Sequence, residues 1–170
     1  NTGEWRVIDG AEATTRDEKI VLGTTTAGTI TGQIYSGGVW SLIPNTTPGL
    51  FTAGIDPAFH NFDVAYETVS GNALMVWQGP TAGLISYRTW NGSTWSAVQN
   101  LNTGIAKAVV NINLASNANS NQIVMQATNN ESNDFAYIWN GTTWVGFTQL
   151  GTNNTLVEPT DANAATESIS

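Results

Sequence analysis

The sequence contains no cysteine among its 170 residues. That absence excludes disulfide bonds, zinc–thiolate sites, iron–sulfur clusters and thiol catalysis together. It leaves the cellular compartment open, because secreted proteins without disulfides exist. No apolar run approaches the roughly 18 residues that a membrane-spanning helix needs. The chain begins at Asn1 without a signal peptide, which favours a processed chain or a segment of a longer protein.

Positive charge is scarce, with five basic residues against 13 acidic ones and a net charge of −8. Nucleic acids and anionic membrane surfaces both attract proteins through clustered cations. The five cations are instead scattered along the chain, at Arg6, Arg16, Lys19, Arg88 and Lys107. We therefore expect no nucleic acid among the partners and no membrane insertion.

Histidine occurs only once, at His60. A Ser-His-Asp triad or a histidine-containing metal site would have to use this residue. It lies in a linker close to Pro57, which favours a surface or structural role. The Asp-x-Asp-x-Asp-Gly pattern of an EF-hand calcium loop is also missing. The sequence thus predicts neither a metal site nor a cofactor.

Carboxylates are the remaining candidates for catalysis, because glycoside hydrolysis needs two of them across a cleft. Glu12 and Glu67 align as equivalent repeat positions at an offset of 55 residues, but the third repeat has no clear acidic counterpart. Sialidases also need an arginine cluster, which the scattered cations do not supply. We therefore interpret Glu12 and Glu67 as solvated or hydrogen-bonded strand residues. The sequence predicts no catalytic residue and no enzyme.

Tryptophan is abundant, with seven residues, and it marks an internal repeat. Residues 85–98 (ISYRTWNGSTWSAV) match residues 135–147 (FAYIWNGTTWVGF). Each stretch holds two aromatic-rich strands around Trp-Asn-Gly-(Ser/Thr)-Thr-Trp. The pairs Trp90/Trp95 and Trp139/Trp144 lie 49 residues apart. Internal repeats of this length indicate a fold built from copies of one supersecondary unit.

A third copy precedes these two. Residues 26–28 match residues 81–83 at an offset of 55, and Trp40 then falls on Trp95. The second strands of the later units align through residues 75–78 and 123–126. The chain, 1–170, is therefore predicted to be a single domain or segment of three units, at about 5–44, 60–101 and 107–150, with a C-terminal tail at 152–170.

Asn-Gly between two strands is the strongest short hairpin signal, because a type I′ turn requires positive φ at both central residues. Asn91-Gly92 and Asn140-Gly141 carry this signal, and Gly37-Gly38 replaces it in the first unit. No window of 11 or more residues has helical periodicity. We therefore predict an all-β fold of tandem four-stranded antiparallel units.

Four-stranded units of about 50 residues are typical of β-propeller blades. Gly92–Trp95 and Gly141–Trp144 look like the Gly-x-Thr-Trp half of the Asp-box hairpin of sialidase-like propellers. The units resemble blades of surface and secreted propeller-repeat proteins, and distantly those of six-bladed fucose-binding lectins. The resemblance implies propeller-like blades. Three blades do not close a ring of roughly four to eight. The chain is therefore a fragment of a longer propeller, or two chains together make six blades, or the fold is a different one, with a β-trefoil as the structural alternative.

The aromatic side chains allow two interpretations. Trp and Tyr rings can cover the apolar face of a sugar, and Tyr87, Trp90, Tyr137 and Trp139 are the predicted stacking residues. Alternatively, a Trp that recurs at one blade position packs between neighbouring sheets. Packing is favoured for Trp40, Trp95 and Trp144, which recur in all three units, and for Trp77.

Five Asn-x-(Ser/Thr) sequons are candidates for glycosylation, at Asn45, Asn91, Asn130, Asn140 and Asn153. The abundance of Asn, Ser and Thr makes several sequons expected by chance, and turn chemistry already accounts for Asn91 and Asn140. Glycosylation would fit an extracellular or cell-surface protein.

These features together favour an extracellular structural or adhesive surface module. Self-assembly into a filament or surface layer would use residues 157–170 of the tail as a strand added to a neighbouring copy. A carbohydrate-binding lectin is the alternative, with glycans as partners, and a glycoside hydrolase-type propeller ranks third.

Overall fold

The computed structural model describes residues 4–43 and 55–151. Within these ranges the chain forms strands and no helix. Three four-stranded antiparallel sheets follow one another, each with its strands in chain order. The first contains β1 (Trp5–Glu12), β2 (Glu18–Thr25), β3 (Ile30–Ser36) and β4 (Val39–Leu42). The second contains β5 (Phe62–Tyr66), β6 (Ala73–Gln78), β7 (Leu84–Trp90) and β8 (Gln99–Asn102). The third contains β9 (Val109–Ser116), β10 (Ile123–Asn129), β11 (Asp134–Trp139) and β12 (Trp144–Gly151).

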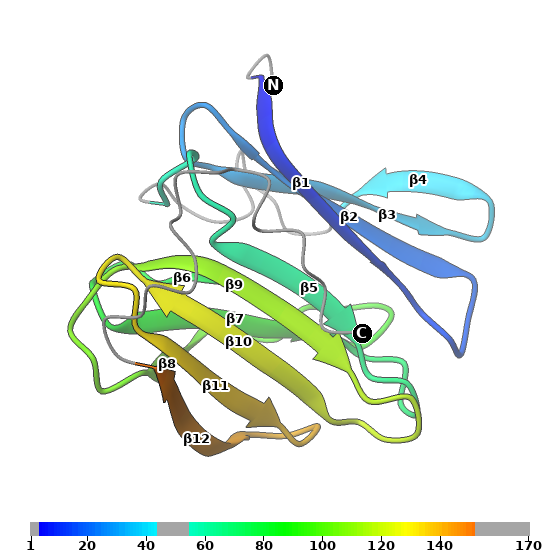
Figure 1. Ribbon diagram of the computed structural model, residues 1–170. Helices are drawn as coiled ribbons and strands as arrows, with labels where there is room; N and C mark the ends of the chain where they lie inside the picture. The colour runs from blue at the N-terminus through cyan, green and yellow to red at the C-terminus, as the bar shows by residue number, and fades with distance from the viewer. Residues whose placement is uncertain (1–3, 44–54, 152–170) are drawn as a thin grey trace.

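The sheets meet through their first strands, β1, β5 and β9 (Figure 1). Between β5 and β9, the amide of Ile112 donates to the carbonyl of His60 at 2.9 Å, and Ser116 Oγ donates to the carbonyl of Tyr66 at 2.7 Å. Each sheet is complete in itself and packs beside the next one. This is the arrangement of propeller blades. The prediction of propeller-like blades is confirmed, and the β-trefoil alternative is wrong. We call the sheets blades 1, 2 and 3.

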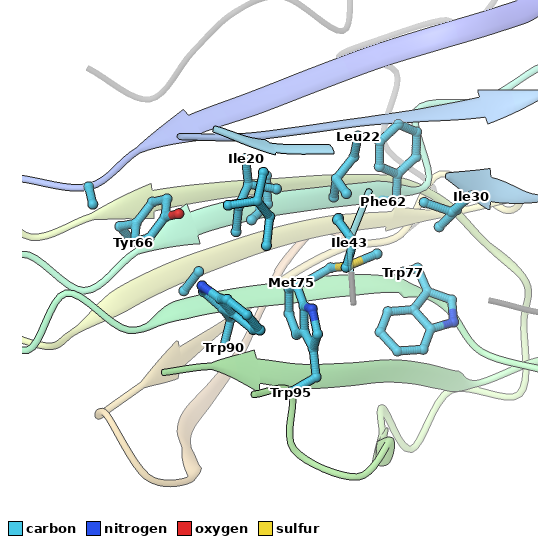
Figure 2. Packing of buried hydrophobic residues seen from close by; sticks show 14 of the residues in the cluster. Ile20, Leu22, Ile30, Ile43, Phe62, Tyr66, Met75, Trp77, Trp90 and Trp95 are labelled. Carbon is cyan, nitrogen blue, oxygen red and sulfur yellow. The ribbon is translucent and has the colours of Figure 1, made fainter. Parts of the chain in front are cut away.

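Two hydrophobic cores fill the two blade junctions. In the first core, Ile20 and Leu22 of blade 1 face Met75 and Trp90 of blade 2 (Figure 2). The second core lies between blades 2 and 3 and includes Leu74. Blade 2 therefore buries both of its faces, and all five residues of β5 are buried. This two-sided burial explains why β6 reads as a nearly continuous apolar run rather than as an alternating pattern.

The tryptophan hairpins differ from the predicted type I′ turns. Trp90 pairs with Trp95, so the loop has four residues, and only Gly92 has a positive φ, of 93°. Oδ1 of Asn91 accepts hydrogen bonds from the amides of Ser93 and Thr94, at 3.0 and 2.9 Å. The asparagine thus caps the turn with its side chain. A two-residue loop with two positive φ angles occurs at Gly37-Gly38 instead.

The repeat alignment of the second strands also needs correction, by two residues. Met75 pairs with Arg88 in blade 2, and Met125 pairs with the equivalent Tyr137 in blade 3. The offset between β6 and β10 is therefore 50, so Met125 corresponds to Met75 and not to Trp77. Side chains alternate between the faces of a strand, so a slip of two residues preserves the apolar pattern and the sequence cannot reveal it.

The tryptophans predicted to pack between sheets do so unequally. Trp77 and Trp95 are buried and Trp144 is partly buried against the second core. Trp40 is 48% exposed, because no described element covers its side of blade 1. Within the described residues, Trp40 therefore does not pack between two sheets.

Several predicted features lie outside the described residues: the tail 152–170 and the sequons at Asn45 and Asn153. The side chains of Asn91, Asn130 and Asn140 are exposed. Residues 4–43 and 55–151 contain no helix long and apolar enough to cross a membrane.

Candidate functional site

The four aromatic residues predicted to stack on a sugar lie in the blade junctions. Tyr87, Trp90, Tyr137 and Trp139 are only 3–8% exposed. The Trp90 ring lies 5.3 Å from that of Trp95, and Tyr87 lies 5.7 Å from Trp139 in an edge-to-face contact. Burial raises the pKa of both Tyr87 and Tyr137. The rings thus have protein neighbours, and their contact with a sugar stays a prediction.

A cluster of polar side chains spans the junction of blades 1 and 2. Glu18 begins β2 and is only 2% exposed. Its Oε1 accepts hydrogen bonds from Trp90 Nε1 at 3.0 Å, from the Tyr66 hydroxyl at 2.8 Å and from Arg16 Nη2 at 2.6 Å. Burial of a carboxylate is unfavourable unless it is paired and hydrogen-bonded, and these three donors meet that condition. We call Arg16, Glu18, Tyr66 and Trp90 the junction cluster.

Arg16 extends from blade 1 over two glycine loops of blade 2. A Cβ atom on Gly71 would lie 2.8 Å from Arg16 Nη1, and one on Gly92 would lie 3.3 Å from Arg16 Cζ. The guanidinium carbon is 5.8 Å from the centre of the Tyr66 ring. The side chain is 30% exposed, yet its buried Nε has no hydrogen-bond partner. The cluster therefore reaches solvent through a partly unsatisfied guanidinium.

Tyr66 contributes the phenolic donor of the cluster. Burial, with the hydrogen bond to Glu18, raises its pKa far above the ordinary value. The hydroxyl therefore remains protonated over the whole physiological range and acts as a fixed hydrogen-bond donor. All three bonds converge on Oε1, and no described side chain donates to Oε2 of Glu18.

The junction of blades 2 and 3 carries a reduced version of this cluster. Trp139 Nε1 donates to Glu67 Oε1 at 2.7 Å, and Glu67 is 1% exposed. The hydroxyl of Ser70 donates a short hydrogen bond to the other carboxylate oxygen. Among the described residues, no arginine or tyrosine side chain donates a hydrogen bond to the Glu67 carboxylate. The two junctions thus share the tryptophan–carboxylate contact, and only the first adds a guanidinium.

The sequence did not reveal the junction cluster, because the carboxylates of the two junctions, Glu18 and Glu67, occupy different backbone positions. The amide of Ala13 donates to the carbonyl of Glu18 across the first loop, as the amide of Glu67 does to that of Asn72 in the second. Glu67 therefore corresponds to Ala13, and Glu18 corresponds to Asn72. The predicted equivalence of Glu12 and Glu67 is off by one residue. Glu12 is 69% exposed and pairs with Lys19.

His60 forms a second polar group, at the first strands of blades 1 and 2. Its Nε2 lies 3.1 Å from Asp9 Oδ2. Buried Asp63 accepts hydrogen bonds from the amides of Val64 and Leu114, both at 2.5 Å, and so connects blades 2 and 3. The contact of His60 with Asp9 agrees with a structural role for this histidine. In the described residues, no group of three or more histidine, cysteine or acidic side chains is arranged to hold a metal ion.

Burial and the neighbouring Asp9 raise the pKa of Asp63 well above its usual value. Burial would also raise the pKa of Asp9, but hydrogen bonds with His60 and Asp63 outweigh it and lower this pKa. Asp63 therefore keeps its proton to higher pH and donates it to an ionised Asp9. The pair is a polar contact between neighbouring first strands.

The fold resembles that of fungal lectins. The Aleuria aurantia lectin, described as having a six-bladed β-propeller fold and a novel fucose recognition mode, superposes with a TM-score of 0.54 and 12% identity; the match covers 85% of this chain and 48% of that one. A point mutant of this lectin in complex with α-methyl-L-fucoside gives a TM-score of 0.53, 14% identity and coverages of 84% and 45%. No protein-family model and no curated protein sequence matches the chain.

At these identities the likeness establishes the fold alone. The chain spans about half the length of the six-bladed lectins, which agrees with its three blades. The similar proteins are lectins and not enzymes.

Proposed function

We propose that this propeller binds carbohydrate at the junction of blades 1 and 2. The observation that carries the proposal is the junction cluster itself, in which partly exposed Arg16 is fixed beside the buried carboxylate of Glu18. A planar guanidinium donates several hydrogen bonds in a fixed geometry, and a carboxylate accepts them. Adjacent sugar hydroxyls offer the complementary acceptors and donors. The fucose-binding lectins of similar fold make an L-fucoside the first ligand to test.

The cluster is also preorganised for such a ligand. Trp90 and Tyr66 hold Oε1 of Glu18, which leaves Oε2 as the acceptor for a sugar hydroxyl. The buried Nε of Arg16, which lacks a partner, would gain one from a hydroxyl oxygen.

Calorimetric titration with methyl α-L-fucoside, followed by a glycan array, tests the proposal. We expect Glu18→Gln to weaken binding at least tenfold, a loss of about 1.4 kcal/mol, because the neutral amide no longer matches the guanidinium. Glu67→Gln is the matched control, since Glu67 makes the same tryptophan contact without an arginine. It should bind within about twofold of the parent chain, well under that 1.4 kcal/mol step.

Two results would contradict the proposal: the absence of binding to every glycan on the array, or equal losses in Glu18→Gln and Glu67→Gln. Melting curves of both variants check that each remains folded. The sequence alone ranks a structural surface module above a lectin, and the lectin folds now favour the opposite order. An extracellular location remains part of the proposal, because glycans are abundant there.

A further inference from the structure

Exposed large hydrophobic side chains gather on the two end blades. Among the described residues, nine of the eleven such side chains belong to blades 1 and 3, and two belong to blade 2. Blade 1 carries Trp5, Ile8, Val39, Trp40 and Leu42, and blade 3 carries Val124, Val145, Phe147 and Leu150. Each end blade has one face that no described element covers. We call these the blade 1 end face and the blade 3 end face.

Two tryptophans form a cleft on the blade 1 end face. Trp5 and Trp40 are 45% and 48% exposed, and with Val21 and Gln33 they line a cavity of about 290 Å³. The ring of Trp5 lies directly against Gly23, where a Cβ atom would come within 1.9 Å of it. The ring of Trp40 packs 5.3 Å from that of Tyr35. Both rings are held in place by the blade while much of their surface remains in water.

The strand register identifies what such a face meets elsewhere in the molecule. Trp40 pairs with Tyr35 as Trp95 pairs with Trp90 and as Trp144 pairs with Trp139. Trp90, Trp95 and Trp139 are buried against the blade before them, and Trp144 packs on the second core. The blade 1 end face thus carries, at the same positions, the residues that a preceding blade covers.

The opposite relation holds for blade 3. Equivalent positions in the second strands of the three blades are occupied by Ile20, Leu74 and Val124. Each of them pairs with the residue that comes just before the last aromatic residue of the third strand in its blade, and these partners are Ile34, Thr89 and Ile138. Ile20 and Leu74 are fully buried beneath the following blade, whereas Val124 is 36% exposed. The blade 3 end face therefore repeats the surface that a following blade covers. The two end faces are the two sides of a blade junction.

We propose that the blade 1 end face packs on the blade 3 end face of a second copy of this chain, so that two copies close a six-bladed ring. The junctions within the chain provide the pattern, because the new contact continues them in the same register. The number of blades agrees as well, since the chain covers 48% of a six-bladed lectin and a second copy supplies three further blades. The proposal is independent of carbohydrate binding at the junction cluster.

The register also identifies residues that meet across the new contact. Thr14 Oγ1 of blade 1 donates to the carbonyl of Thr68 in blade 2, at 3.1 Å, and Thr68 Oγ1 donates to the carbonyl of Asn117 in blade 3, at 2.7 Å. Ala118 is the blade 3 equivalent of Thr68 by its position in the loop. We therefore expect Ala118 of one copy to lie beside Thr14 of the other.

Cysteine cross-linking tests this contact, because the chain has no cysteine of its own. Copies with Thr14→Cys are mixed with copies with Ala118→Cys and oxidised. The mixture should form a covalent dimer, while each variant alone should not. A mixture of Thr14→Cys with Ser93→Cys, at an exposed hairpin, measures random collisions. Thr14→Cys with Thr68→Cys in one chain is the positive control for an internal bond.

Mass by light scattering provides the second readout. The parent chain should have twice its single-copy mass of 18.1 kDa. Trp40→Ser should reduce this to one copy, and Val98→Ser, at an equally exposed valine of blade 2, should not. A single-copy mass for the parent chain with no cross-link in the mixture would overturn the proposal. A series of cross-linked oligomers from the Thr14→Cys/Ala118→Cys double variant would show an open filament and would overturn the closed ring. A covalent dimer of Thr14→Cys alone would show that two blade 1 end faces meet back to back and would overturn the proposed pairing of end faces.

Discussion

Acidic side chains make several of the polar contacts between neighbouring blades. Glu18 and Glu67 each accept a hydrogen bond from a tryptophan of the next blade, and Asp63 accepts one from the amide of Leu114. A charged side chain at a junction needs several partners, because desolvation penalises the ion. These contacts fix the position of each blade relative to the next, while the apolar cores supply most of the favourable free energy.

The Asp9–Asp63 contact makes the free energy of unfolding depend on pH. A carboxyl whose pKa is raised in the folded chain stabilises it fully below the ordinary pKa of 3.8 and loses that contribution as the pH rises through the raised value. Asp63→Asn keeps the side chain neutral and still able to donate to Asp9. We expect the stability of this variant, relative to the parent chain, to increase as the pH rises from 3.8 toward neutrality.

Urea unfolding at a series of pH values measures this difference. Asp56→Asn, at an exposed turn, is the control for the loss of one negative charge. If the difference between the parent chain and Asp63→Asn does not change with pH, Asp63 does not hold its proton in the folded state.

At the scale of strands and hairpins, the local sequence is informative about contacts within one blade, between strands that are neighbours in the chain. The alternation of strands and Asn-Gly loops predicted the four-stranded units, and one sheet falls in each of them. Contacts between blades were not predictable in this way. Trp90 reaches a carboxylate 72 residues earlier in the chain, and no local pattern marks Arg16 or Glu18 as its partners. The two-residue error in the alignment of β10 also arises because the local pattern is not sufficient. The apolar pattern shows which face of a strand is buried, but a shift of two residues leaves that face unchanged, so the pattern does not fix the register.

The tryptophan hairpin provides a prediction about its glycine. Gly92 has a φ of 93°, a region that costs an alanine about 1–2 kcal/mol. Gly92→Ala should lower the free energy of unfolding by at least this amount, because its Cβ would also press on Arg16. Gly104→Ala has a φ of 74° and no atom within 4 Å, so it isolates the backbone effect. A melting temperature of Gly92→Ala equal to that of the parent chain would show that the hairpin has a different conformation.

At the scale of the whole molecule, three blades with two cores have one fully enclosed blade and two half-covered ones. The sequence predicted the blades, yet not which faces are covered, because Trp40 and Trp95 look alike in their repeats. Their burial differs because blade 1 packs on the face of blade 2 that carries Trp95, whereas no described blade packs on the face of blade 1 that carries Trp40. Burial at these positions is a property of the assembled blades and not of the repeat.

This arrangement predicts that equal truncations have unequal effects. Val76 in the enclosed blade is fully buried, whereas Val124 on the blade 3 end face is 36% exposed. Val76→Ala removes buried methyl groups and leaves a cavity, so it should lower the free energy of unfolding by about 2 kcal/mol. Val124→Ala should cost less than about half of that in a dilute single copy, because its site is already partly in water. Denaturant unfolding at low and high protein concentration measures both values. If two copies close a ring, the loss of unfolding free energy caused by Val124→Ala should rise with protein concentration, while the loss caused by Val76→Ala should not. Equal losses for the two variants at low concentration would mean that the blade 3 end face is already covered within one chain.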